Sequence, residues 1–206
     1  MKTNMMKSWA LACLMIWCCS HSSMAQHRQG DQTFQPRVGV TLSNLPGEEN
    51  SKMKVNLSYG VEIEQFLTDQ FSGAGGVLFT NQGCKVDDEN VSWKINLYYS
   101  TFPITANYYL LPGLAVKAGL QPAFRVKAKI EEGGEKIDLD RAMQLIFEDD
   151  DMKINSFDLA IPLGLSYEFQ GVTLDARYNL GLIKLFSGFD GNVRNSVFAI
   201  TLGYKF

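Results

Sequence analysis

Histidine, cysteine and long apolar runs are scarce in this sequence, and each scarcity excludes a class of protein. Two histidines and four cysteines occur among 206 residues, and beyond residue 25 only His27 and Cys84 are left. The chain beyond that point cannot close the internal disulfide that many small secreted domains need. No later stretch approaches about 18 uninterrupted apolar residues, so no transmembrane helix is expected. The net charge of −3 gives no basic field for nucleic acid.

The first 25 residues predict a cleaved signal peptide. Lys2 and Lys7 precede a short apolar segment, and Ser23 and Ala25 place small residues where signal peptidase reads them. The apolar segment is about half as long as the roughly 20 residues of a spanning helix. A lipoprotein leader is the alternative, but its three cysteines are either too early or preceded by a bulky residue or another cysteine. We therefore expect a signal peptide, residues 1–25, and one domain, residues 26–206.

Apolar and polar residues alternate in several segments of that domain, which predicts β-strands with two different faces. In the last segment, alternate residues are large and apolar up to the terminal Phe206. Pro103 and Pro122 lie inside expected strands, where a bulge or a lost ladder hydrogen bond should disturb the register. The eight expected strands span residues 37–43, 55–67, 71–82, 93–111, 114–130, 156–169, 172–186 and 196–206.

Short and long connections alternate between these strands. The short ones are residues 68–70, 112–113 and 170–171, and the long ones are 44–54, 83–92, 131–155 and 187–195. Outer-membrane barrels show this asymmetry, with short periplasmic turns and long extracellular loops. The N-terminus and Phe206 are then both expected on the periplasmic side.

The character of the two faces distinguishes a membrane barrel from a soluble one of the lipocalin type, which would bind an apolar ligand inside. One face is bulky and free of charge, with aromatic residues near many strand ends, as bilayer interfaces favour. The other mixes small residues with long charged ones, which suits the interior of an eight-stranded barrel. We therefore predict an all-β, eight-stranded antiparallel up-and-down transmembrane β-barrel in the cell outer membrane, closed by pairing of the first and last strands.

Almost the whole domain resembles the outer-membrane β-barrel domain family of Bacteroidota, which includes porin-like and PorT-like proteins. The resemblance rests on the segments "RVGVTLSNL", "LFTNQGCK", "FPITANYYL", "FDLAIPLGLSYEF" and "GYKF". It implies an integral outer-membrane protein and permits an accessory role in protein secretion. The terminal strand ending in Phe206 is similar to the signal that the outer-membrane assembly machinery reads.

Little in the sequence points to catalysis, a cofactor or a metal. His21 leaves with the signal peptide and His27 is expected in a disordered tail, so no histidine base is available and we expect no enzyme. Cys84 is interpreted as an incidental unpaired thiol. Loop 131–155 carries carboxylates at Asp138, Asp140 and 148–151 without a calcium-loop pattern, and we interpret it as a solvated acidic loop. Its segment 141–147 is the alternative contact for an extracellular partner.

Charged residues on the inward face carry the main functional hypothesis. Left unpaired they would be costly, so we predict a salt-bridge network that plugs the barrel. The protein is then a structural or binding protein of the cell surface with a closed lumen, and a narrow channel for ions or small solutes is the alternative. The nine expected inward residues are Glu62, Glu64, Lys117, Arg125, Lys127, Asp158, Glu168, Asp175 and Arg177.

Overall fold

The computed structural model describes residues 27–44, 51–52, 54–82, 85–88, 91–132, 135–138, 153–184, 186–187 and 194–206; the expected signal peptide lies outside them. None of the helices in this described part is long and apolar enough to cross a bilayer. The strands are β1 (Gln32–Asn44), β2 (Ser51–Lys52), β3 (Lys54–Phe66), β4 (Phe71–Gln82), β5 (Lys85–Asp88), β6 (Val91–Thr101), β7 (Ile104–Leu111), β8 (Leu114–Glu132), β9 (Glu135–Asp138), β10 (Lys153–Ile154), β11 (Phe157–Phe169), β12 (Val172–Lys184), β13 (Phe186–Ser187) and β14 (Arg194–Tyr204).

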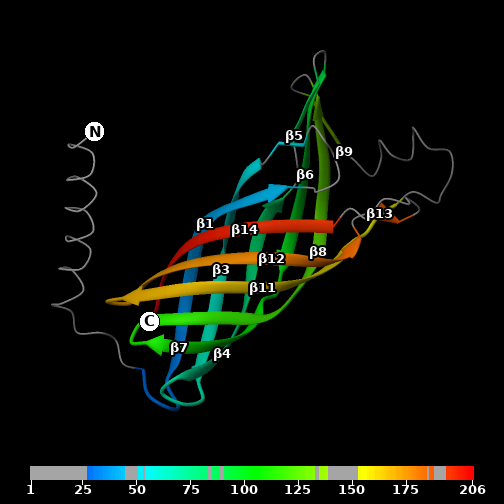
Figure 1. Cartoon of the computed structure of the whole chain (residues 1–206). Helices are drawn as coiled ribbons and strands as arrows, with labels where there is room; N and C mark the ends of the chain where they lie inside the picture. The colour runs from blue at the N-terminus through cyan, green and yellow to red at the C-terminus, as the bar shows by residue number, and fades with distance from the viewer. Residues whose placement is uncertain are drawn as a thin grey trace, which may run out of the picture.

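The long strands close into a barrel in which each pairs antiparallel with its neighbours in sequence (Figure 1). The first strand, β1, pairs with β3 on one side and with the last strand, β14, on the other, from Arg37 opposite Gly203 to Asn44 opposite Ser196. Phe34 and Phe206 also exchange two backbone hydrogen bonds, at 3.0 and 3.3 Å. The eight-stranded antiparallel barrel and the pairing of its first and last strands are thus confirmed, with β6 and β7 together forming one barrel strand.

That composite strand is interrupted at Pro103, as the sequence predicts. Thr101 opposite Ala123 and Ile104 opposite Leu120 keep the same register with β8, so only the ladder is broken. At Pro122 the pairing of β8 with β11 keeps one register on both sides, so no bulge lies there, and the proline costs the ladder only the N–H that it lacks. The register shift of β8 lies instead near Lys127, opposite Tyr98 and Tyr99.

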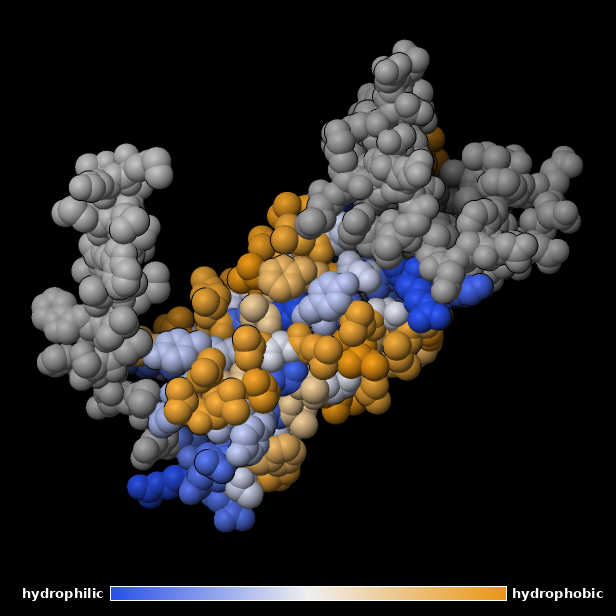
Figure 2. Space-filling view, viewed as in Figure 1, coloured by the Kyte–Doolittle hydropathy of each residue, from blue (hydrophilic) through white to orange (hydrophobic). Residues whose placement is uncertain are grey.

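Apolar side chains point out of the barrel and polar side chains point in. Alternate residues of β3, from Val55 to Ile63, are exposed, whereas Glu62 and Glu64 are 3% and 2% exposed. Figure 2 shows the result on one side of the barrel, where apolar residues cover most of the middle and hydrophilic residues gather toward both ends. A soluble lipocalin-like barrel has the opposite arrangement, so that alternative is wrong for this chain.

The two ends of the barrel differ, and we call them the turn end and the loop end. The turn end holds residues 67–70, 112–113 and 170–171; Gln170 and Gly171 both adopt positive φ, of 50° and 81°, as in a tight hairpin. At the loop end, part of the expected loops is strand. Within 83–92 β5 pairs with β6, and within 131–155 β9 pairs with β8, because the alternation continues past the barrel wall.

Candidate functional site

In the described part of the chain, buried charged side chains from strands far apart in sequence meet in the lumen. Small residues on neighbouring strands make room for them. Gly76 is paired with Glu62, and a methyl group added there would lie 2.6 Å from the Glu62 Cγ atom. Gly164 is paired with Arg177, and a methyl group added at Gly164 would lie 2.9 Å from the Arg177 Cγ atom. These two inward-facing glycines therefore leave room for the long side chains of Glu62 and Arg177.

Five of these side chains form a central cluster across the middle of the lumen. Arg177 binds both carboxylates: its Nη1 lies 2.6 Å from Glu62 Oε1 and its Nε lies 2.7 Å from Asp175 Oδ1. Arg37 spans the same two groups, at 2.5 Å from Glu62 Oε2 and 2.8 Å from Asp175 Oδ2. Lys117 completes the cluster at 3.0 Å from Asp175. The cluster joins β1, β3, β8 and β12, so it ties the paired strands β1 and β3 to β8 and β12, with which they share no ladder.

The central cluster carries three cations and two carboxylates, and its side chains are between 1% and 4% exposed. Taking such groups out of water costs several kcal/mol each, which close and multiple pairing offsets. Each guanidinium contacts both carboxylates, so removing any one member leaves an opposite charge without part of its partners. The arrangement is therefore suited to holding the lumen shut and offers no open position to a reactant.

A second group, the turn-end cluster, surrounds Lys205. Its Nζ lies 2.8 Å from Glu64, 2.7 Å from Glu168 and 2.9 Å from the Tyr109 hydroxyl. Tyr109 in turn donates to Glu64 at 2.8 Å, and Asn107 donates to the same oxygen at 2.8 Å. Burial lowers the pKa of Lys205, but the charges of Glu64 and Glu168 raise it more, so it lies above its ordinary value. Lys205 is therefore held charged.

His27 belongs to this cluster, so its expected place in a disordered tail is wrong. Its Nε2 lies 2.9 and 3.0 Å from the two oxygens of Glu168, and its ring stacks on Phe66 with 4.3 Å between centroids. Backbone hydrogen bonds from Gly30 to Phe66 and from Phe66 to Asp31 fix the segment against the barrel. Beside it lies a cavity of about 300 Å³, open at the turn end and lined in part by residues of the turns 67–70 and 112–113.

Toward the loop end the buried lumen side chains are mostly short and neutral, with Asp158 lining the smaller of two voids, and the lumen is less completely filled. Thr80, Gln121 and Asn179 are buried there among alanine and valine side chains. Two voids of about 20 Å³ and 10 Å³ lie between them, the larger of which bounds the central cluster at Arg177. A void of that size has room for about one water molecule and for no larger ligand.

Most of the expected inward residues lie where the alternation predicts. Six of the nine are buried in the two clusters: Glu62, Glu64, Lys117, Glu168, Asp175 and Arg177. Arg125 and Asp158 are half-buried toward the loop end. The prediction that Lys127 faces the lumen is wrong, because the bulge exposes Val126 and Lys127 in succession and turns Ala128 inward.

Arg37 and Lys205 are charged lumen residues that the alternation did not single out. Both stood on the polar side of an alternating segment, since Arg37 precedes Val38 and Lys205 lies between Tyr204 and Phe206. Opposite Arg37 on both neighbouring strands stand glycines, Gly60 and Gly203, which only the register reveals.

The other residues considered from the sequence add no site. Cys84, Asp140 and segments 141–147 and 148–151 lie outside the described residues, and Asp138 is exposed. Within the described ranges, no three histidine, cysteine or carboxylate side chains gather as a metal ion requires.

Comparison with known proteins identifies a family and a fold. The family model described as outer membrane protein beta-barrel domain matches residues 24–187. The attachment invasion locus protein Ail of Yersinia pestis is 15% identical, with a TM-score of 0.51, and the match covers 86% of this chain and 99% of Ail. Neisserial surface protein A is 15% identical, with a TM-score of 0.50, covering 85% and 97%. No curated protein sequence matches the chain.

Proposed function

Because the chain belongs to the family of outer membrane protein β-barrel domains and lies in the outer membrane, we propose that it is a structural or binding protein with a closed lumen. The observation that carries this proposal is the central cluster, in which Arg37 and Arg177 each contact Glu62 and Asp175 from different walls. The protein performs no catalysis in this proposal, and its binding surfaces are the two ends of the barrel and its lipid-facing wall.

Conductance in planar bilayers tests the closed lumen. The wild-type protein is expected to show no steady openings. The double variant Glu62→Ala with Arg177→Ala removes one charge of each sign and the bulk between the walls, so it is expected to conduct. Steady openings of the wild type would contradict the proposal. Silence of both proteins in membranes that contain folded barrel would mean that the neutral loop-end half also blocks the path.

The alternative of a narrow channel has one observation in its favour. The voids of about 20 Å³ and 10 Å³ share Gln82, Gln121, Asn179 and Val197 in their walls, so they lie next to each other beyond the central cluster. A path that uses them requires the side chains of the central cluster and of the turn-end cluster to move aside. A wild-type conductance that Arg37→Lys enlarges would favour this alternative.

An accessory role in secretion, as in PorT-like proteins of Bacteroidota, is a further proposal and rests on the resemblance alone. A deletion strain that loses secreted proteins, and regains them with wild type but not with the Glu62→Ala/Arg177→Ala variant, would support it. Secretion unchanged by the deletion would contradict it. An extracellular partner at loop 131–155 also stays a prediction, to be tested with a variant whose residues 139–152 are replaced by a Gly-Ser linker.

Recognition by the outer-membrane assembly machinery is proposed for the terminal strand. Phe206 is 72% exposed while its backbone pairs with Phe34, so the ring is available outside the barrel. Phe206→Ala is expected to slow assembly in cells while leaving refolding of the purified protein into lipid vesicles unchanged. Equal slowing in both settings would assign the ring to stability instead.

A further inference from the structure

Two cations, Lys184 on β12 and Arg194 on β14, lie side by side at the loop end and form what we call the rim pair. They are partners in the register of these strands, and both are exposed. The alternation places them on the lipid-facing side, since Leu182 and Leu180 precede Lys184 at alternate positions and are also exposed. Like charges directly opposite each other in a sheet are destabilising. An anion placed between them would interact favourably with both side chains.

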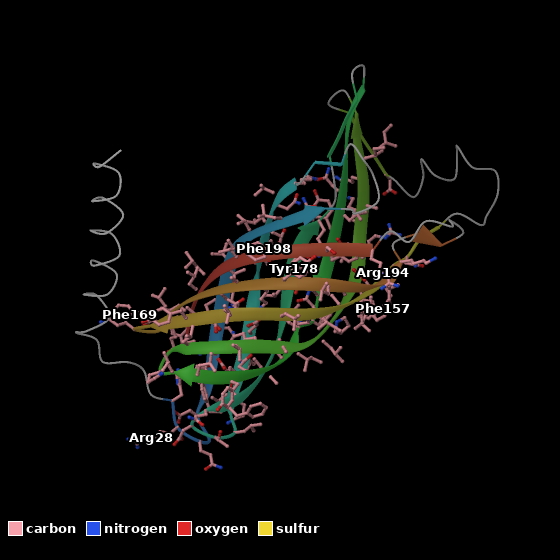
Figure 3. All side chains as sticks on the ribbon, in the orientation of Figure 1. Arg28, Phe157, Phe169, Tyr178, Arg194 and Phe198 are labelled. Carbon is pink, nitrogen blue, oxygen red and sulfur yellow. The ribbon has the colours of Figure 1, made fainter. Side chains whose placement is uncertain are left out.

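Aromatic side chains place the rim pair at the level of lipid headgroups. Phe102, Phe124 and Phe157 form a row of ring contacts across neighbouring strands, with centroids 5.9 and 5.3 Å apart. Such aromatic rows mark the bilayer interface in transmembrane barrels. Phe157 and Lys184 each lie three residues beyond the paired Ala160 and Gly181, so the rim pair continues this row. Figure 3 shows Phe157 and Arg194 at the same end of the barrel, opposite Arg28.

The space-filling view agrees with this level. In Figure 2 a hydrophilic patch borders the apolar band at the loop end, where β12 and β14 end. The pairing of β12 and β14 shifts between Leu180 and Lys184, a bulge that aims the strand ends differently from the ladder below. Apolar side chains below and two cations above complement the acyl chains and the anionic headgroup of a lipid.

We propose that the rim pair binds the phosphate of a membrane lipid whose headgroup lies in the leaflet at the loop end. A phosphate oxygen can accept from the Lys184 ammonium while the Arg194 guanidinium donates two parallel hydrogen bonds. Arg194 already interacts within the chain, and its guanidinium carries five N–H donors in all. The acyl chains of such a lipid lie along Leu180, Leu182 and Tyr178, which are exposed below the pair.

The test measures lipid binding to the full-length protein folded in phosphatidylcholine nanodiscs, with bisphosphorylated lipid A as the added probe. Each cation near a membrane surface contributes about fivefold in affinity. Lys184→Gln and Arg194→Gln are each expected to weaken binding about fivefold, and the double variant about 25-fold. Lys184→Arg should keep wild-type affinity. Arg28→Gln, which removes an exposed cation at the opposite end, is the matched control and should also bind as wild type.

Three results would overturn the proposal. The first is equal affinity of the wild type and the double variant. The second is equal weakening by Arg28→Gln, which would mean a general effect of net charge. The third is competition by inorganic phosphate at a concentration equal to that of the lipid, which would assign the pair to a free anion. The single variants keep the test decisive if the double variant fails to fold, and the closed lumen is tested separately by conductance.

Discussion

The two halves of the lumen are filled by different chemistry. The middle and the turn end are filled by charged side chains that reach across from opposite walls, with ion-pair distances between 2.5 and 3.0 Å. The loop-end half is filled mainly by short neutral side chains, with Arg125 and Asp158 half-buried, and voids of about 20 Å³ and 10 Å³ are left there. Long side chains of opposite charge therefore fill a polar lumen as apolar side chains fill the core of a soluble domain. Stability should therefore depend unequally on the two halves.

The largest effect is expected from Asp175→Asn in the central cluster. The change leaves Arg37, Lys117 and Arg177 with the single carboxylate of Glu62, and breaking a buried ion pair in this way costs about 3–5 kcal/mol. Urea unfolding in lipid vesicles measures the loss. The control is Asn179→Ala, four residues farther along the same strand toward the loop end, where about 0.5–1.5 kcal/mol is expected. Equal losses at both positions would remove the distinction between the halves.

A lipid-facing substitution tests the outer wall of the barrel while leaving the lumen intact. Leu163 is exposed in the middle of β11, where an arginine side chain in contact with lipid costs about 2–4 kcal/mol. Val172→Arg at the turn end of β12 is the control, and about 0–1 kcal/mol is expected there because an interfacial arginine reaches water. Assembly yield and urea unfolding in vesicles measure both variants. Wild-type stability of Leu163→Arg would contradict the assignment of the two faces.

Lys205→Met separates the turn-end cluster from the central one. It leaves Glu64 and Glu168 without their shared cation, at an expected cost of about 1.5–3 kcal/mol. Because the pKa of Lys205 is raised by folding, its contribution is complete below the ordinary value of 10.5 and is lost as the pH rises through the higher folded-state value. The difference in unfolding free energy between wild type and variant should therefore be constant from about pH 7 to about pH 9 and shrink above about pH 11. A difference that grows with pH would contradict this account.

The barrel could be predicted from the sequence because alternation in a membrane strand is imposed twice, by lipid outside and by the lumen inside. Glu62 and Asp175 followed directly from their place on the polar face. What alternation cannot reveal is an extra residue in a strand, and the bulge near Lys127 is one: it changes the face of every later residue. Proline was a poor guide to such breaks, because Pro122 keeps the register and the bulge lies elsewhere.

The partners within the lumen could not be predicted, for a different reason. Which cation reaches which carboxylate depends on strand stagger, which the sequence does not encode locally. His27 shows this, because its contact with Glu168 joins residues 141 positions apart across the turn end. The same holds for Lys205 and Glu64. They meet only because β14 pairs with β1, and β1 pairs with β3, the strand that carries Glu64.

The smallest effect is expected from Thr201→Val in the last strand. The Thr201 side chain is buried beside the larger void, and its hydroxyl makes no hydrogen bond within the described residues. Replacing an unpaired hydroxyl by a methyl group of the same shape is nearly neutral or slightly stabilising, so the unfolding free energy should change by less than about 0.5 kcal/mol. Thr105→Val is the matched control, because Thr105 bonds Asn107 at 3.1 Å, next to the turn-end cluster, and should cost about 1 kcal/mol. A loss at Thr201 as large as at Thr105 would mean that the hydroxyl beside the larger void is held by a hydrogen bond as specific as those of the turn-end cluster.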